Sequence, residues 1–158
     1  FGVTEVIPDV PGYTTHYVTA DELVLIVPPS PHCQKDTISL EEFFKQPLIM
    51  REPGSGTRKV LTQYLEAKGY TTSQLNIIAE MSTIDAIKSA VQAGMGGSVV
   101  PRLSVKREIY QGTLKALKIS DLEMPLNYNI IRLNQHYLSS KARQLIKFLT
   151  DPEERFLC

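Results

Sequence analysis

Two short segments of this sequence combine residue types that can hold an anion where a helix begins. The first is Glu52-Pro-Gly-Ser-Gly-Thr-Arg58, which follows an apolar run and precedes a stretch with helical periodicity. Glycines leave backbone N–H groups accessible, and the helix dipole favours a negative group at this end. Arg51, Arg58 and Lys59 add positive charge, although an ordinary strand-to-helix turn with solvated basic residues is the alternative. We predict that the turn contributes four residues to a ligand site: Ser55, Gly56, Thr57 and Arg58.

The second segment begins at Ser82 and Thr83, either of which can cap a helix. Asp85 stands three residues after Ser82, an arrangement typical of a capping box. Apolar residues then recur at helical spacing until Gly94, which suits the left-handed position after a helix. A purely structural capping role is the alternative here. The residues predicted to face a ligand are Ser82, Thr83 and Ile84.

No constellation of catalytic or metal-binding residues is visible. Pro53 stands where a Gly-x-Ser-x-Gly motif needs glycine, and the turn lacks the spacing of a Walker loop. Cys33 and Cys158 lack metal-ligand spacing, which argues against a zinc site or a disulfide framework. The histidines are scattered over predicted loops with no acid or nucleophile at a telling spacing: His16, His32 and His136. The sequence therefore predicts no catalytic residue, no metal and no cofactor, and it argues against an enzyme.

Alternating strands and helices position these segments. Strands are predicted at 22–27, 47–51, 75–79, 98–101, 114–119 and 126–133, and residues 1–16 are predicted to be mostly loop. Helices are predicted at about 39–45, 57–68, 84–93, 101–110 and 140–150. This alternation is typical of an α/β sandwich with a largely parallel sheet. In such a sheet, two helix starts that follow neighbouring strands converge on one crevice, where ligands bind.

Composition limits the function classes. The chain has 158 residues, 42% of them hydrophobic and 22% charged, which is typical of a globular protein. Seventeen basic residues balance seventeen acidic ones without a Lys/Arg block, so the chain itself lacks the charge pattern of a nucleic-acid binder. No apolar run of about eighteen residues predicts a membrane span. Because the first residue is Phe1 rather than methionine and no signal segment follows it, we expect a fragment of a longer protein. The two isolated cysteines favour a reducing cytosol.

Several segments follow one another in a recognisable order from about Asp21 over nearly the whole chain. They are residues 22–28 (ELVLIVP), 44–49 (FKQPLI), 52–58 (EPGSGTR), 82–96 (STIDAIKSAVQAGMG), 99–101 (VVP), 112–114 (GTL) and 138–143 (LSSKAR). Taken in this order, they resemble the effector-binding domain of LysR-type transcriptional regulators, particularly the carbon-fixation (RuBisCO operon regulator-like) branch. Two departures accompany the resemblance: Pro31-His32 reverses the family's usual His-Pro order, and the family's opening strand–helix–strand is absent.

This resemblance implies a fold and a domain organisation. The expected fold is α/β and two-lobed, like the type II periplasmic binding proteins, with the first lobe incomplete at the N-terminus. Residues 19–120 would form regulatory lobe II, and residues 1–18 with 121–158 would be a remnant of lobe I. The DNA-binding helix-turn-helix of the family is not in this chain.

The resemblance also implies a function. A small anionic metabolite of carbon metabolism would bind between the lobes and control DNA binding and transcription. Ser55–Arg58 and Ser82–Ile84 would supply part of that site, with Val100 and Arg102 near its edge. The implied partners are a homodimer or homotetramer (with helix 57–68 as a candidate contact), DNA only through the absent helix-turn-helix, and RNA polymerase, but no membrane.

The implied location is the bacterial cytosol or the plastid stroma. One alternative is a periplasmic-type solute-binding protein of the same fold, and another is an enzyme built on that fold. A signal peptide upstream would favour the first, and a reactive side chain in the cleft would favour the second.

Overall fold

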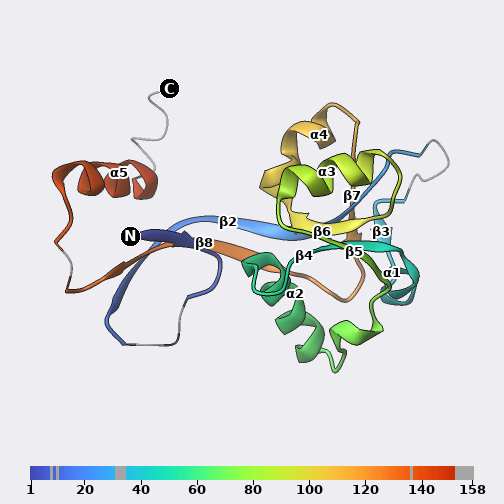
Figure 1. Ribbon diagram of the computed structural model, residues 1–158, viewed down its shortest axis with the longest axis horizontal. Coiled ribbons are helices and arrows are strands. Elements are labelled where there is room, and N and C mark those ends of the chain that lie inside the picture. Colours follow the sequence, from blue (N-terminus) through green and yellow to red (C-terminus); the bar gives the residue numbers. More distant parts are fainter. Residues whose placement is uncertain (8, 10, 31–34, 136, 152–158) are drawn as a thin grey trace. The chain divides into compact units, whose positions relative to one another are not determined.

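The computed structural model describes residues 1–7, 9, 11–30, 35–135 and 137–151 (Figure 1). Two compact units divide the chain: unit 1 comprises Phe1–Ala20 and Asn127–Cys158, and unit 2 comprises Asp21–Leu126. The strands are β1 (Gly2–Thr4), β2 (Tyr13–Val27), β3 (Thr37–Ile38), β4 (Leu48–Arg51), β5 (Ile77–Met81), β6 (Ser98–Pro101), β7 (Lys115–Ile119) and β8 (Pro125–Leu133). The helices are α1 (Leu40–Lys45), α2 (Gly56–Ala67), α3 (Ile84–Gln92), α4 (Lys106–Tyr110) and α5 (Ser140–Thr150), with 3₁₀ turns η1 (Thr72–Gln74) and η2 (Arg102–Val105).

The sheet of unit 2 is mixed, which corrects the prediction of a largely parallel sheet. β4 pairs with β5 in parallel, and β3 pairs with β7 in parallel. Gly97 ties β6 to β4 by donating its N–H to the Pro47 carbonyl and accepting one from Ile49. β2, however, is antiparallel to both β6 and β7. The alternation of strands and helices could not reveal this, because β2 is not joined to either partner by a single crossover helix.

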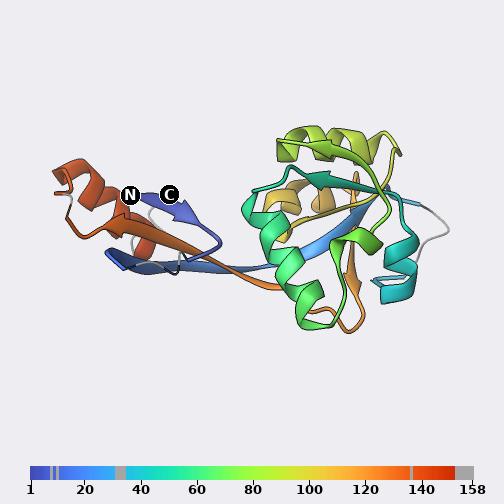
Figure 2. The ribbon, with the colours of Figure 1, turned by 60° about the horizontal axis from the view of Figure 1, so that its bottom comes forward.

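Helices cover both faces of this sheet, as the two ribbon views show (Figures 1 and 2). α3 packs through Ile87, Ala90 and Val91 into a cluster with Val24, Ile26, Ile49 and Val100. α2 lies against the opposite face and buries Val60, Leu61 and Leu65. Because side chains alternate along a strand, Ile49 can face α3 while its neighbours in β4 face the other way. Unit 2 therefore has a complete hydrophobic core of its own.

Most predicted element ends are confirmed by the turn geometry. Gly69, Gly94 and Gly112 have φ angles of 82°, 78° and 68°, a backbone conformation that glycine adopts without strain. Ser39 caps α1 in a capping box with Glu42, as the spacing predicts. β5 is displaced by two residues from its predicted position because η1 takes up the residues before it. The predicted helix at 101–110 is divided into η2 and α4.

β2 is much longer than predicted and replaces most of the expected N-terminal loop. It begins at Tyr13 rather than at Glu22. The continuous apolar run 22–27 predicts a strand, whereas residues 13–20 contain no such run. Those eight residues are mainly aromatic and β-branched, which favours an extended chain with partly exposed faces. His16 therefore lies in a strand rather than a loop, whereas His32, His136, Cys33 and Cys158 lie outside the described residues.

Unit 1 is poor in buried side chains. β1 pairs with β8 in antiparallel fashion, β8 neighbours β2, and Ser139 caps α5. Among the described residues of this unit, only Asn129, Ile130 and Ile146 are buried. The large apolar side chains that stay exposed include Phe1, Val3, Ile7, Tyr13, Tyr17, Leu133, Leu145 and Phe148. Two buried aliphatic side chains supply little of the apolar burial that stabilises an independent domain.

A partly buried ion pair joins α3 to α4 in unit 2. Lys88 contacts Glu108 at 3.1 Å and Asp85 at 2.9 Å, and the Lys88 and Glu108 side chains are only 18% and 16% exposed. A hydrogen bond from its own backbone N–H lowers the pKa of Glu108 most, the Lys88 ammonium lowers it further, and burial opposes both. The carboxylate therefore stabilises the folded state while it is ionised.

Glu108→Gln is expected to lower the free energy of unfolding at pH 7 by about 1 kcal/mol. Because the folded-state pKa lies below the usual 4.5, the wild-type advantage is complete above that pH and disappears as the pH falls through the depressed value. Urea titrations at several pH values measure this difference. Glu66 is an exposed acid on α2, and Glu66→Gln is the control that should leave the free energy of unfolding unchanged. If wild type and Glu108→Gln still differed in free energy of unfolding at acid pH, where the carboxylate is protonated, the charge of Glu108 would not be the cause.

Candidate functional site

The first candidate segment forms the turn between β4 and α2. Ser55 caps α2, and its Oγ accepts a hydrogen bond from the Arg58 backbone N–H at 3.2 Å. Gly54 has a φ of 97°, which lets the chain reverse between the strand and the helix. Ser55 and Thr57 are buried, whereas Gly56 is partly exposed. The predicted residues therefore form the first turn of α2.

The second candidate segment forms the turn between β5 and α3. Thr83 is the cap, since its Oγ1 accepts from the Ala86 N–H at 3.2 Å. The proposed Ser82–Asp85 capping box is therefore wrong, because Asp85 lies one residue too early for a helix capped by Thr83. Ser82 and Thr83 are exposed, and Ile84 is partly buried at the beginning of the helix.

The parallel pairing of β4 with β5 brings these two helix starts to the same edge of the sheet. Arg51, the last residue of β4, lies opposite Met81, the last residue of β5. Within the described residues, no hydrogen-bond acceptor is found for the first two backbone N–H groups of either helix, a usual feature of helix N-termini. These four donors belong to Gly56, Thr57, Ile84 and Asp85. An anion near this edge would find both helix dipoles favourable.

The arginines predicted to add positive charge here are compensated by carboxylates. Arg51 donates to Glu52 through Nε at 2.9 Å and through Nη2 at 3.0 Å. The Arg58 guanidinium donates to the Arg51 carbonyl at 2.9 Å and forms an ion pair with Glu80. These carboxylates also hold the arginines in place, and the Arg51 guanidinium keeps the pKa of Glu52 below its usual value. Sequence spacing could not show the Arg58–Glu80 pair, because 22 residues separate its members.

The two residues predicted at the edge of the site have different surroundings. The Val100 side chain is 0% exposed and packs in the core beneath α3, so it has no surface for a ligand. Arg102 is exposed where β6 ends, and it contacts Glu22 at 3.4 Å. Because β6 runs parallel to β4 beside Gly97, its end lies at the same edge as the two helix starts.

Residues that sequence reasoning missed also lie at this edge. The Asp21 carboxylate accepts the Leu103 N–H at 3.1 Å, and so fixes the chain after β6. The chain enters unit 2 beside Asp21 and leaves it after Leu126, and the Leu23 N–H donates to the Met124 carbonyl at 2.9 Å. The Asp21–Leu103 bond therefore lies at the same edge of unit 2 as the helix starts. The sequence could not show this role of Asp21, because the Leu103 N–H that binds its carboxylate lies 82 positions away.

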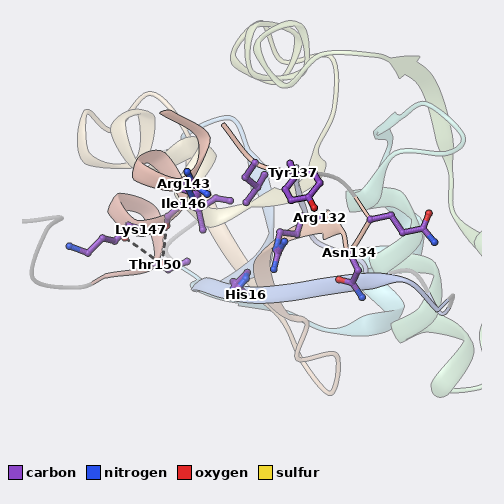
Figure 3. Close-up of a pocket in the computed structure, with 10 residues that line it drawn as sticks. His16, Arg132, Asn134, Tyr137, Arg143, Ile146, Lys147 and Thr150 are labelled. Carbon is purple, nitrogen blue, oxygen red and sulfur yellow. Dashed lines mark hydrogen bonds between the residues drawn. The ribbon is translucent and has the colours of Figure 1, made fainter. Parts of the chain in front are cut away.

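A separate pocket of about 750 Å³ lies in unit 1, between α5 and the strands (Figure 3). None of the predicted site residues lines it. Its charged lining residues are Arg132, Arg143 and Lys147, and no carboxylate side chain is among the described residues that line it. The shortage of buried apolar side chains around it indicates an open packing surface rather than a formed ligand site.

The described residues contain neither a metal-binding cluster nor a helix suited to span a membrane. Among the residues that the structure describes, no three His, Cys, Asp or Glu side chains come close enough together to hold a metal ion. None of the described helices combines the length and the apolar character needed to cross a membrane.

Comparison with known proteins shows which family the chain matches. The model of the LysR substrate binding domain matches residues 1–152. An uncharacterised HTH-type transcriptional regulator of Methanocaldococcus jannaschii is 32% identical over 140 residues, covering 88% of this chain and 47% of that protein. A probable RuBisCO transcriptional regulator of Synechocystis is 31% identical over 139 residues, covering 84% of this chain and 40% of that protein.

A solved structure has the same fold. The CcmR regulatory domain of Synechocystis PCC6803, in complex with 2-PG, superposes with a TM-score of 0.80 at 23% identity. The match covers 95% of this chain and 73% of that domain. The chain spans about half the length of the curated relatives it matches. The predicted two-lobed α/β fold class and the resemblance to regulators of the carbon-fixation branch are thereby confirmed, and the chain belongs to the LysR substrate-binding domain family.

Proposed function

We propose that this chain senses a small anionic metabolite for a LysR-type transcriptional regulator, and that unit 2 holds the anionic group at its helix starts. One observation carries the proposal: two capped helices begin side by side at the paired ends of β4 and β5. Their free N–H groups and dipoles favour a carboxylate or a phosphate. Ser55–Arg58, Ser82–Ile84 and Arg102 make up the proposed site, and Val100 supports it from the core.

The same proposal covers the organisation of the regulator. Unit 1 belongs to regulatory lobe I and unit 2 forms lobe II, so the lobes meet at 20/21 and 126/127 rather than at the predicted 18/19 and 120/121. DNA is bound by a helix-turn-helix outside these residues, in a homodimer or homotetramer that works with RNA polymerase in the bacterial cytosol or plastid stroma. The exposed polar face of α2 is the candidate contact between copies. Effector binding controls transcription only if its affinity differs between two arrangements of the regulator.

Calorimetry on the complete gene product tests the proposed site. The ligands are 2-PG, other small carboxylates and phosphate monoesters, with neutral polyols of similar size as controls. Anionic compounds are expected to bind, and at a hundredfold excess over Kd they should raise the free energy of unfolding by about 2.7 kcal/mol. Equal binding of neutral compounds, or no binding by any anion in the panel, would overturn the proposal.

A further inference from the structure

We infer that Arg58 is a positioning residue for the proposed anion site, held by Glu80, and does not supply the charge that meets the ligand. The inference rests on the proposed function and assigns a role that the residue type alone did not suggest. An arginine beside a glycine-rich helix start is normally taken as a direct partner for an anion. Here its hydrogen bonds are directed at the protein.

Arg58 connects three elements at the edge of the sheet. It lies in the first turn of α2, donates through Nη1 to the backbone carbonyl of Arg51 at the end of β4, and pairs with Glu80 in β5. Its side chain is only 19% exposed, compared with 43% for Glu80. Both bonds come from Nη1, whose two N–H groups are held in fixed directions by the planar guanidinium, whereas the ammonium of a lysine rotates freely on a flexible stem.

The turn that Arg58 holds contains two glycines, so it is costly to order even with the Ser55 cap in place. Gly54 and Gly56 lie within four residues of Arg58, and glycine costs the most conformational entropy to order. The ligand needs the Gly56 and Thr57 N–H groups to point in one direction before it arrives. A fixed first turn gives tighter binding because less ordering remains to be done on association. The Arg58–Glu80 pair orders the turn in advance.

Charge compensation defines the class of ligand. Arg51 pairs with Glu52 and Arg58 with Glu80, so the four side chains carry no net charge. The ligand's negative charge is then met by backbone dipoles at the two helix starts. These short-range donors suit one compact group, a carboxylate or a phosphate, rather than several charges spread along a molecule. Binding to such a neutral site should also depend only weakly on salt.

Glu80→Gln separates positioning from charge. If Arg58 met the ligand, removing the competing carboxylate would leave a freer cation and would tighten anion binding. If Arg58 positions the turn, the same substitution loosens it and should weaken binding of 2-PG and of inorganic phosphate about five- to tenfold. Arg58→Lys keeps the charge and should weaken binding to a similar extent. Glu66→Gln removes an acid elsewhere on α2 and is the matched control, expected to bind like wild type.

Calorimetry measures the Kd of each variant of the complete gene product at low and high salt. Tm is measured in parallel to check that each variant is folded. Failure of wild type to bind any anion would overturn the proposed function itself. Wild-type binding with tighter or unchanged binding by Glu80→Gln would overturn only the positioning role. Should Glu80→Gln not fold, Arg58→Lys decides alone, and wild-type affinity in that variant would overturn the inference.

Discussion

Gly96→Ala is expected to lower the free energy of unfolding by about 3 kcal/mol, because no space exists for a side chain there. A Cβ at this position would lie 2.6 Å from the Pro47 carbonyl oxygen and 3.2 Å from its carbon. Both are backbone atoms, and the same carbonyl accepts the Gly97 N–H at 2.9 Å. Relieving the clash would separate β6 from β4 and break that hydrogen bond.

Urea denaturation followed by circular dichroism measures this loss, since the chain has no tryptophan to report by fluorescence. Gly2→Ala is the matched control, because nothing lies within 4 Å of a Cβ built there. The control should unfold like wild type. If Gly96→Ala were equally stable, the close approach of β6 to β4 would not hold in solution.

Thr83→Asp is expected to weaken binding of a small anion at least about tenfold while leaving the fold intact. Aspartate caps a helix as well as threonine, so the bond to the Ala86 N–H is retained and Tm should stay close to wild type. The new carboxylate lies beside the free N–H groups of Ile84 and Asp85, where the proposed ligand would place its own charge. Two like charges at about 4 Å repel by about 1–4 kcal/mol near a protein surface, and 1.4 kcal/mol is tenfold in affinity.

Calorimetry with 2-PG measures the change in affinity, and thermal unfolding measures the change in stability. Ser39→Asp provides the control, since Ser39 caps α1 in the same unit and lies outside the proposed site. It should affect neither binding nor stability appreciably. Wild-type affinity in Thr83→Asp would exclude the start of α3 from the site.

Local features of the fold were predictable because they depend on neighbouring residues. Ser39 and Glu42 predict the capping box of α1, and Gly69, Gly94 and Gly112 mark the ends of three helical segments. Capping bonds and left-handed glycines act over three or four residues, so spacing alone reveals them. The choice of Thr83 over Ser82 was not settled in this way, because both can cap and only the path of the chain after β5 selects one.

Strand pairing was less predictable. The antiparallel orientation of β2 and its early beginning at Tyr13 depend on which strands lie beside it. A partly exposed strand without a continuous apolar run gives a weak periodic signal. Gly96 also gave no signal of its importance, since the carbonyl it must avoid lies 49 positions earlier in the chain.

The sequence by itself determined the two helix starts and the family resemblance, because each depends on residue types at short and fixed spacing. Only the tertiary structure decided the electrostatics of the candidate site. Parallel pairing of β4 with β5 brings Glu80 to Arg58, so a side chain that looked like a free cation is already paired. Ion pairs form between groups that folding brings within a few ångströms, and separation along the chain does not report that distance.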